Sequence, residues 1–158
     1  MAKKPLEEEL KDYNAMFIAL KDIVDEIPQE MLTVRLQPPA WSIKEIICHI
    51  VDNEINNNIH MKKIISEKRP NLQNFDDVGW AKRLEYTAWN LQEAILLFGL
   101  LRSSMGHILE NLPESAWKRS GIREDTGSVS LRKLLEDANN HCKHHLARII
   151  ERKIKLEK

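Results

Sequence analysis

The sequence predicts an all-α protein, a four-helix bundle, on three observations. Four long segments carry apolar residues at the three- and four-residue spacings of amphipathic helices, and no segment shows a convincing period-two alternation. Most of the 5 glycines and 6 prolines lie between the four segments. Helices of this kind bury their apolar faces by packing on one another. Because 158 residues is a typical length for one domain, we expect residues 1–158 to form a single helical bundle.

The first two helices are defined by an apolar stripe and by a start signal. The stripe from Leu6 to Ile27 predicts the first helix, and Pro28 ends it because the residue before a proline is pushed out of the helical region. Ser42 and Glu45 have the spacing of a capping box, which predicts the start of the second helix. That helix should run to about Ser66.

The second half of the chain predicts two more helices. A linker rich in Asn and Asp follows Pro70, and a third helix should span roughly Glu85 to Asn111. The stretch from Glu114 to Ser130 contains glycines and polar residues that indicate turns. The last helix should begin near Ser130 and continue close to the C-terminus.

Composition and charge exclude some classes of function. With 24 basic and 24 acidic residues the formal charge is zero, which argues against nucleic-acid binding and against an anionic membrane surface as partner. The N-terminus lacks the apolar stretch of a signal peptide, and the longest apolar run, residues 94–101, is far too short to span a membrane. We therefore expect a cytoplasmic protein, in which Cys48 and Cys142 remain free, structural thiols.

Histidines on the last helix are the strongest candidates for a functional site. His145 falls near the centre of the inward stripe and His141 on its flank, whereas His144 points away. A spacing of four residues brings two imidazoles together on one helix face, so His141 and His145 form a candidate metal-binding pair. From spacing alone, ordinary partly buried histidines are an equally good interpretation.

Two histidines on the second helix are candidates to complete the site. His49 lies beside the apolar stripe and would join the pair if the helices pack suitably. His60 lies 11 residues further along, and a helical rise of roughly 16 Å prevents it from sharing one ion with His49. We interpret His60 as a surface histidine.

The same residues carry a family resemblance. Residues 41–46 (WSIKEI) leading to 49–54 (HIVDNE) resemble the second-helix signature of the DinB superfamily, and 141–149 (HCKHHLARI) resembles its last-helix signature. Residues 75–81 (FDDVGWA) are similar to a linker of its YfiT-like branch. The resemblance covers most of the chain, from about Leu36 to Ile149, and its motifs are specific in combination.

The resemblance implies a four-helix bundle, often a homodimer, with a divalent metal ion such as zinc or nickel. Its ligands here would be His49, His141 and His145, which leave a coordination position for water or substrate. Better-understood members of the family are transferases or isomerases that use low-molecular-weight thiols such as bacillithiol or mycothiol. Others are assigned as metal-dependent hydrolases.

Two acidic residues near His49 are further candidates. The YfiT-like branch tends to have a histidine where this chain has Glu54, so Glu54 could transfer protons or orient a ligand, although a salt-bridged helix residue is the simpler interpretation. Asp52 matches an aspartate of the family and could be the partner of a ligand imidazole or face solvent.

The sequence leaves two hypotheses for function. The first is a metal-dependent enzyme, a thiol S-transferase or hydrolase that acts on a small-molecule substrate. The second is a non-catalytic metal-binding module with a role in stress response or protein interaction, which is favoured by the lack of a clear general base beyond the ligands.

The four tryptophans are interpreted as packing residues, with Trp80 as the residue least clearly assigned to the core.

Overall fold

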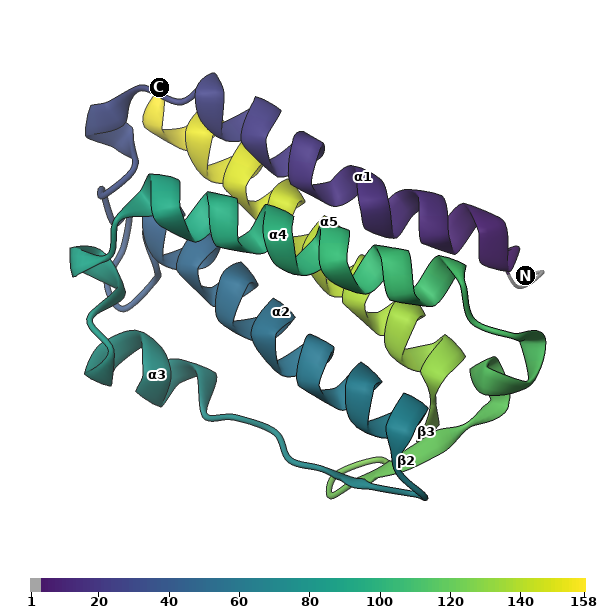
Figure 1. Ribbon diagram of the computed structural model, residues 1–158. Helices are drawn as coiled ribbons and strands as arrows, with labels where there is room; N and C mark the ends of the chain where they lie inside the picture. Colours follow the sequence, from purple (N-terminus) through teal and green to yellow (C-terminus); the bar gives the residue numbers. More distant parts are fainter. Residues whose placement is uncertain (1–3) are drawn as a thin grey trace.

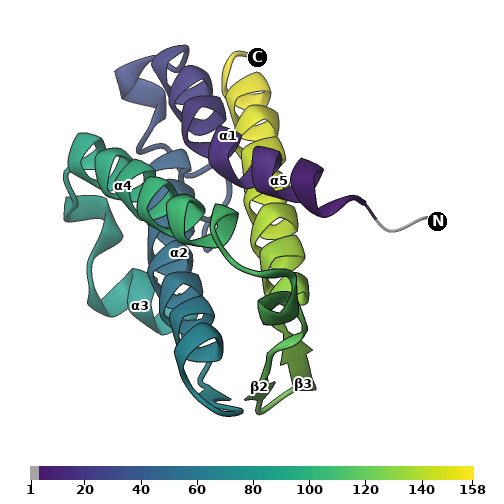
Figure 2. The ribbon, with the colours of Figure 1, turned by 45° about the vertical axis from the view of Figure 1, so that its right-hand side comes forward.

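Four long helices form a bundle in the computed structural model, which describes residues 4–158. They are α1 (Leu6–Asp25), α2 (Ile43–Ser66), α4 (Leu91–Glu110) and α5 (Leu131–Leu156). α1 packs mainly on α4 and α5, and so does α2, so that α1 and α2 occupy opposite corners (Figures 1 and 2). The predicted four-helix bundle is confirmed.

The direction of the helices explains the longest connection in the chain. α1 and α5 run one way and α2 and α4 run the other, so α2 and α4 are parallel neighbours (Figure 1). The chain must therefore return along the bundle between them. Residues 67–90 make this crossover, which carries β1 (Asn71–Leu72), α3 (Asp77–Arg83) and a 3₁₀ turn (Tyr86–Ala88). The crossover places polar residues beside α2.

The predicted start of the third helix was wrong by about six residues. Glu85 has a left-handed φ of 51°, which interrupts the helix, and α4 begins only at Leu91. Asn90 caps it, because its side-chain oxygen accepts hydrogen bonds from the backbone N–H groups of Gln92 and Glu93. A local cap therefore determined the boundary, and the apolar periodicity that extends upstream did not.

The sequence showed no convincing period-two alternation, yet the described part of the chain contains three short strands beside the helical bundle. β2 (Ser120–Arg123) follows a 3₁₀ helix (Glu114–Lys118) and pairs antiparallel with β3 (Gly127–Ser130), while β1 adds to β2 in parallel. Strands of two and four residues are too short to show a period of two. Gly121 is needed in β2, because a Cβ there would lie 2.9 Å from the carbonyl oxygen of Pro70.

The core and one helix cap fix the position of α2. Its inward residues pack between those of the other long helices, and the buried set includes Leu20, Ile46, Phe98, Leu135, Cys142 and Ile149. The predicted capping box is present: Ser42 accepts from the backbone N–H of Glu45, whose carboxylate accepts from the N–H of Ser42 at 2.9 Å. Arg35 pairs with the same carboxylate. The start of α2 is thus fixed two turns before His49.

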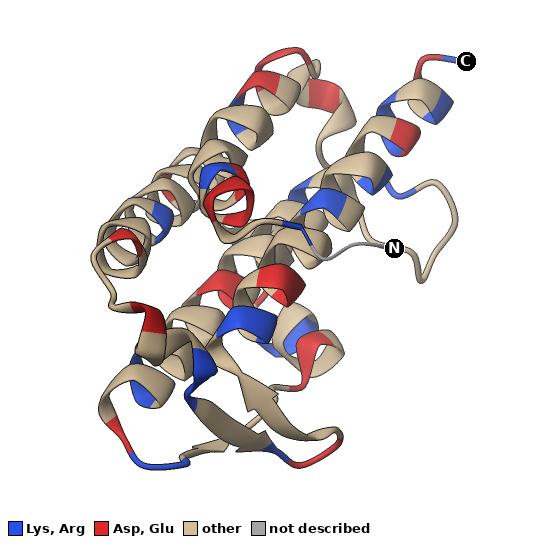
Figure 3. Ribbon diagram, turned by 90° about the vertical axis from the view of Figure 1, so that its right-hand side faces the viewer, with Lys and Arg blue, Asp and Glu red and all other residues tan. Residues whose placement is uncertain are grey.

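Charged residues of both signs are interspersed along the helices (Figure 3). None of the helices among residues 4–158 combines the length and apolarity needed to cross a bilayer.

Candidate metal centre

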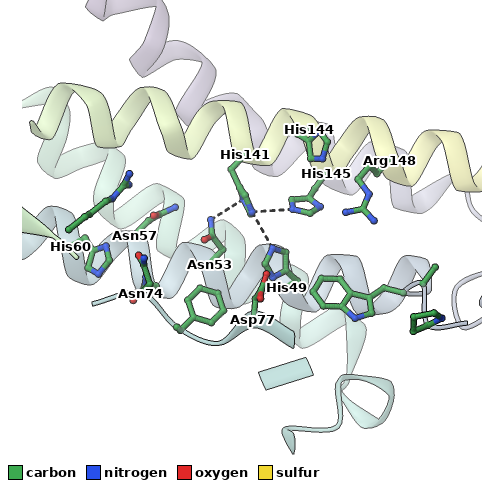
Figure 4. Close-up of a pocket in the computed structure, with 16 residues that line it drawn as sticks. His49, Asn53, Asn57, His60, Asn74, Asp77, His141, His144, His145 and Arg148 are labelled. Atoms are coloured by element: carbon green, nitrogen blue, oxygen red, sulfur yellow. Dashed lines mark hydrogen bonds between the residues drawn. The ribbon is translucent and has the colours of Figure 1, made fainter. Parts of the chain in front are cut away.

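Three histidine side chains from two helices converge on one point. His141 and His145 lie one turn apart on α5, and His49 faces them from α2 (Figure 4). The Nε2 atom of His141 is 3.1 Å from Nε2 of His49 and 3.0 Å from Nε2 of His145. One ligand atom from each residue lies within 4.8 Å of the other two. The contacts between α2 and α5 thus bring His49 to the pair.

This arrangement fits a divalent cation. Zn–N bonds of about 2.0–2.1 Å in tetrahedral geometry separate the ligand atoms by about 3.3 Å, close to the two Nε2 separations in this structure. Three imidazole nitrogens at such a distance cannot all satisfy one another, because each neutral ring carries only one N–H. A cation would accept the lone pairs of all three. The donor set and the spacing therefore support a metal site.

The three rings are held in two different ways. The amide nitrogen of Asn53 lies 2.9 Å from Nδ1 of His141, and rotation of the amide by 180° would present its oxygen to a ring N–H. Nδ1 of His49 and Nδ1 of His145 are buried and have no hydrogen-bond partner among the described residues. The ring of His49 packs instead on Trp41, with ring centroids 5.1 Å apart, and on Phe75 at 6.2 Å.

Burial keeps the three imidazoles neutral. Desolvation, together with the neighbouring histidines, lowers the pKa of His141 from 6.5 to about 4 and that of His145 to about 3. Burial also lowers the pKa of His49, and the carboxylate of Asp77 partly opposes this shift. Because a metal binds the unprotonated nitrogen, the site has ligands in the required state at neutral pH.

A polar pocket surrounds the three histidines. It has a volume of about 680 Å³ and is bordered by α2, α5 and the crossover. Asp77 is the only carboxylate among the described residues that line it, and it lies on the side of His49 away from α5 (Figure 4). Arg148 extends from α5 toward the space between the two helices (Figure 4). The remaining lining residues are Pro39, Ala40, Trp41, Asn53, Asn56, Asn57, His60, Asn74, Phe75, Arg123 and His144.

His144 and His60 line the same pocket but do not belong to the three-histidine cluster. His144 is exposed and its ring contacts that of His145, with centroids 5.3 Å apart. His60 was predicted to lie on the surface, and this was wrong: its side chain is 4% exposed and its Nε2 lies 3.0 Å from the carbonyl oxygen of Gln73. The crossover covers this part of α2, and an apolar stripe on the helix alone could not indicate that cover.

The two acidic candidates are buried away from the pocket lining. Glu54 pairs with Arg102, whose Nε is 2.8 Å from a carboxylate oxygen, and it also accepts hydrogen bonds from Tyr13 and Asn58. Asp52 accepts a hydrogen bond from the hydroxyl of Tyr86 in the crossover. Neither borders the pocket around the three histidines.

Both cysteines are free and buried, in keeping with the structural interpretation. Burial raises the pKa of Cys48 to about 12 and that of Cys142 to about 11, so neither thiol is activated as a nucleophile. Trp80 packs on Phe75, with ring centroids 4.6 Å apart, and is partly buried.

Three pocket residues were missed as functional candidates. Asp77, Arg148 and Asn53 lie within the segments 75–81, 141–149 and 49–54 that carry the family resemblance, but the sequence indicated no role for any of them. The signal for Asn53 was its position four residues after His49, on the same helix face. Asp77 and Arg148 could be recognised only when the crossover and the end of α5 were placed in space.

A helical bundle that gathers three imidazoles in a polar pocket has the arrangement expected of a metal-binding four-helix bundle. The chain belongs to the DinB superfamily, which it matches over residues 15–149.

Two relatives at the sequence level accompany this match. A protein of Oceanobacillus iheyensis, named as a candidate metal-dependent hydrolase, is 27% identical over 130 residues, which cover 82% of this chain and 75% of the relative. YfiT of Bacillus subtilis, named in the same way, is 23% identical over 136 residues, 84% of this chain and 75% of YfiT.

The structure of YfiT, described as an unusual four-helix bundle topology, superposes with a TM-score of 0.91 at 20% identity and covers 99% of this chain and 90% of YfiT. A mycothiol-dependent maleylpyruvate isomerase superposes with a TM-score of 0.75 at 13% identity, over 93% of this chain and 62% of the isomerase. Both likenesses establish a shared fold.

Proposed function

We propose that this chain is a metal-dependent enzyme that delivers a nucleophile, either water or a small thiol, to an electrophilic small molecule. It would then be a hydrolase or a thiol S-transferase. The observation that carries the proposal is the meeting of His49, His141 and His145 in a pocket large enough for a small molecule. Three protein ligands that leave a position open are typical of catalytic rather than structural zinc sites.

The three imidazoles would hold a divalent ion, with zinc and nickel as the leading candidates. Such an ion supplies Lewis acidity and lowers the pKa of a water or thiol bound to it. Asn53 would orient the ring of His141, and Trp41 and Phe75 would keep the ring of His49 in place.

Asp77 is the residue that we propose as proton acceptor. Its carboxylate borders the pocket and is exposed, so it can exchange a proton with solvent after each reaction. For Asp52 and Glu54 we propose indirect roles. Asp52 would hold the crossover against α2 through Tyr86, and Glu54 would fix α2 in the core through Arg102.

Metal analysis tests the site itself. Protein purified without a histidine tag should contain about one divalent ion per chain, and His49→Ala, His141→Ala and His145→Ala should each lose it. His144→Ala is the matched control, because His144 is an exposed neighbour on the same helix. Full occupancy in the three ligand variants would rule out the proposed centre.

A substrate screen then separates the two reactions. The metal-loaded protein is assayed with ester, amide and activated-halide electrophiles, each with and without a panel of low-molecular-weight thiols. Turnover that needs a thiol identifies a transferase, and turnover in water alone identifies a hydrolase. Asp77→Asn should lower kcat for either reaction while metal content is unchanged. A metal-loaded protein that turns over nothing would favour the non-catalytic metal-binding module.

We also propose a homodimer in the cytoplasm. Support for the dimer comes from three exposed leucines on α4: Leu96 is 59% exposed, Leu97 39% and Leu100 69%. Leu96→Glu with Leu100→Glu should yield a monomer in analytical ultracentrifugation, whereas Ile59→Glu, at an exposed position on α2, should leave the mass unchanged. A cytoplasmic location would keep the two free thiols reduced.

A further inference from the structure

Two arginines on α5 follow the metal-binding pair along the helix. Arg148 lies three residues after His145 and Arg152 lies seven after it, which places them about 4.5 Å and about 10 Å further along the helix axis. Both side chains are half-buried. Within residues 4–158, neither guanidinium has a carboxylate or carbonyl partner within ion-pair or hydrogen-bond distance.

The other arginines of the chain differ in that they either have a partner or are exposed. Each half-buried or buried one has a carboxylate or backbone carbonyl as partner, and Arg69, which also lacks one among the described residues, is exposed in a loop. The paired arginines are Arg35 with Glu45, Arg83 with Asp76, Arg102 with Glu54, Arg119 with the carbonyls of Ile64 and Glu67, Arg123 with Asp137, and Arg132 with Glu136. Arg148 and Arg152 are therefore the exception in this fold.

Their placement costs free energy in the absence of an anion. Like charges four residues apart on a helix repel one another, and partial burial removes some of the water that would solvate them. Burial and the charge of Arg148 both lower the pKa of Arg152. Glu151 lies nearby, but its carboxylate is engaged by Lys155. The carboxylates of Glu151 and Glu45 oppose part of the shift in the pKa of Arg152, but no described carboxylate forms an ion pair with either guanidinium.

The two arginines line a groove that continues from the histidine pocket. This second cavity has a volume of about 490 Å³, and Leu36 and Gln37 of the loop before α2 form its other wall. Glu151 and Lys155, which pair with each other, also line it on the α5 side. Ala40 and Arg148 border both cavities. A ligand can thus extend from the three histidines past Arg148 to Arg152 without leaving the surface depression.

We infer that Arg148 and Arg152 bind the oxyanion end, carboxylate or phosphate, of a ligand whose other end reacts at the three-histidine centre. The inference rests on the proposed metal centre and names the substrate class: an extended, anionic small molecule. Guanidinium groups bind carboxylates and phosphates through paired N–H donors, and an anion between the two would relieve their repulsion.

The first experiment uses metal-free protein, so that it does not depend on the metal centre. Inorganic phosphate and succinate are titrated at constant ionic strength, with chloride as the reference salt, and binding is followed by thermal unfolding and by NMR signals of the arginine Nε–H groups. We expect at least one anion to stabilise the protein and to shift two arginine signals, and the anion that does so identifies the oxyanion.

Variants make this result specific. Arg148→Gln with Arg152→Gln should abolish the stabilisation by the anion, and this variant should be at least as stable as the parent without it, because a repulsion is removed. Arg69→Gln is the matched control for loss of charge and should behave as the parent. Equal anion binding by the double variant, or no binding by the parent, would overturn the inference.

The second experiment tests whether one ligand reaches both places. Co²⁺-loaded protein is titrated with mercaptocarboxylates of increasing chain length and with the matching mercaptoalcohols, and the thiolate-to-cobalt absorption band reports binding at the metal. We expect one chain length at which the carboxylate binds at least tenfold more tightly than the alcohol. The advantage should disappear in Arg148→Gln with Arg152→Gln and persist in Arg69→Gln.

The two experiments fail in different ways. If cobalt does not bind, or binds equally well to His145→Ala, the proposed metal centre is wrong. Anion binding by the metal-free protein is still tested independently, because it depends only on Arg148 and Arg152. If cobalt and thiols bind but the carboxylate gives no advantage at any chain length, the metal centre survives and the anion site is refuted.

Discussion

Two buried polar clusters of α2 differ in the kind of group that they bring together. In the core, the carboxylate of Glu54 meets the guanidinium of Arg102, two opposite charges that are 1% and 2% exposed. In the pocket, three imidazoles meet one another, and two of their Nδ1 atoms have no partner among the described residues. Unlike groups satisfy each other and stabilise the fold. Three neutral imidazoles satisfy one another only in part, and their convergence is the arrangement that a metal-ligand set requires.

The core cluster should give the largest effect when it is broken. Arg102→Met leaves the Glu54 carboxylate buried without a cation, although Tyr13 and Asn58 still donate to it, and we expect a loss of about 3–5 kcal/mol in the free energy of unfolding. Urea denaturation measures it. The exposed pair of Arg83 and Asp76 is the control, and Arg83→Gln should cost less than about 1 kcal/mol. A small loss in Arg102→Met would contradict the structural role of the cluster.

At the three-histidine cluster, the free energy of unfolding should rise when metal binds, whereas truncation of one histidine should leave the protein folded. Metal at 100 times its dissociation constant should raise the free energy of unfolding of the parent by about 2.7 kcal/mol, and removal with a chelator should reverse this. His145→Ala should lose the response but remain folded, because its removal leaves no unpaired charge. Thermal unfolding with and without zinc or nickel measures the difference, and an equal metal response in His145→Ala would be incompatible with the site.

Asn53 offers a finer test of the pocket. Asn53→Leu removes the hydrogen-bond partner of His141 and should weaken metal affinity by about 10–100-fold. Asn56→Leu is the matched control, since Asn56 also lines the pocket on α2. Competition with a chromophoric chelator gives both affinities. If the two variants lose affinity equally, Asn53 has no specific effect on the His141 ring.

The smallest effect per residue is expected from pH in the metal-free protein. In the unfolded chain these histidines titrate near 6.5, whereas burial lowers the pKa of His141 to about 4 and that of His145 to about 3. Between pH 6.5 and about 4 the unfolded state therefore binds more protons, so stability falls as the pH is lowered.

We expect each of these histidines to contribute a loss on the order of 1–2 kcal/mol from pH 7 to pH 5, measured by urea denaturation. His145→Gln should reduce this slope and His144→Gln should not. A slope that is the same in all three proteins would assign the acid sensitivity to other groups.

Sequence alone predicted the four long helices and the pair on α5, because both depend on spacing within one helix. The capping box of Ser42 and Glu45 fixed the start of α2 for the same reason. The strands, the start of α4 at Asn90 and the burial of His60 depend on short or distant contacts that leave no periodic signal. His49 is intermediate, because its helix face was predictable from the apolar stripe, whereas its meeting with the pair on α5 was inferred mainly from the family resemblance.

The parallel arrangement of α2 and α4 has a consequence for how such a protein can diversify. It obliges the chain to return through residues 67–90, and this return supplies Asn74, Phe75 and Asp77 to the pocket wall. The three histidines belong to α2 and α5, which the core holds rigid. Changes in the crossover can therefore alter what enters the pocket while the ligand set stays intact, so one scaffold can acquire new substrates by varying a single connection.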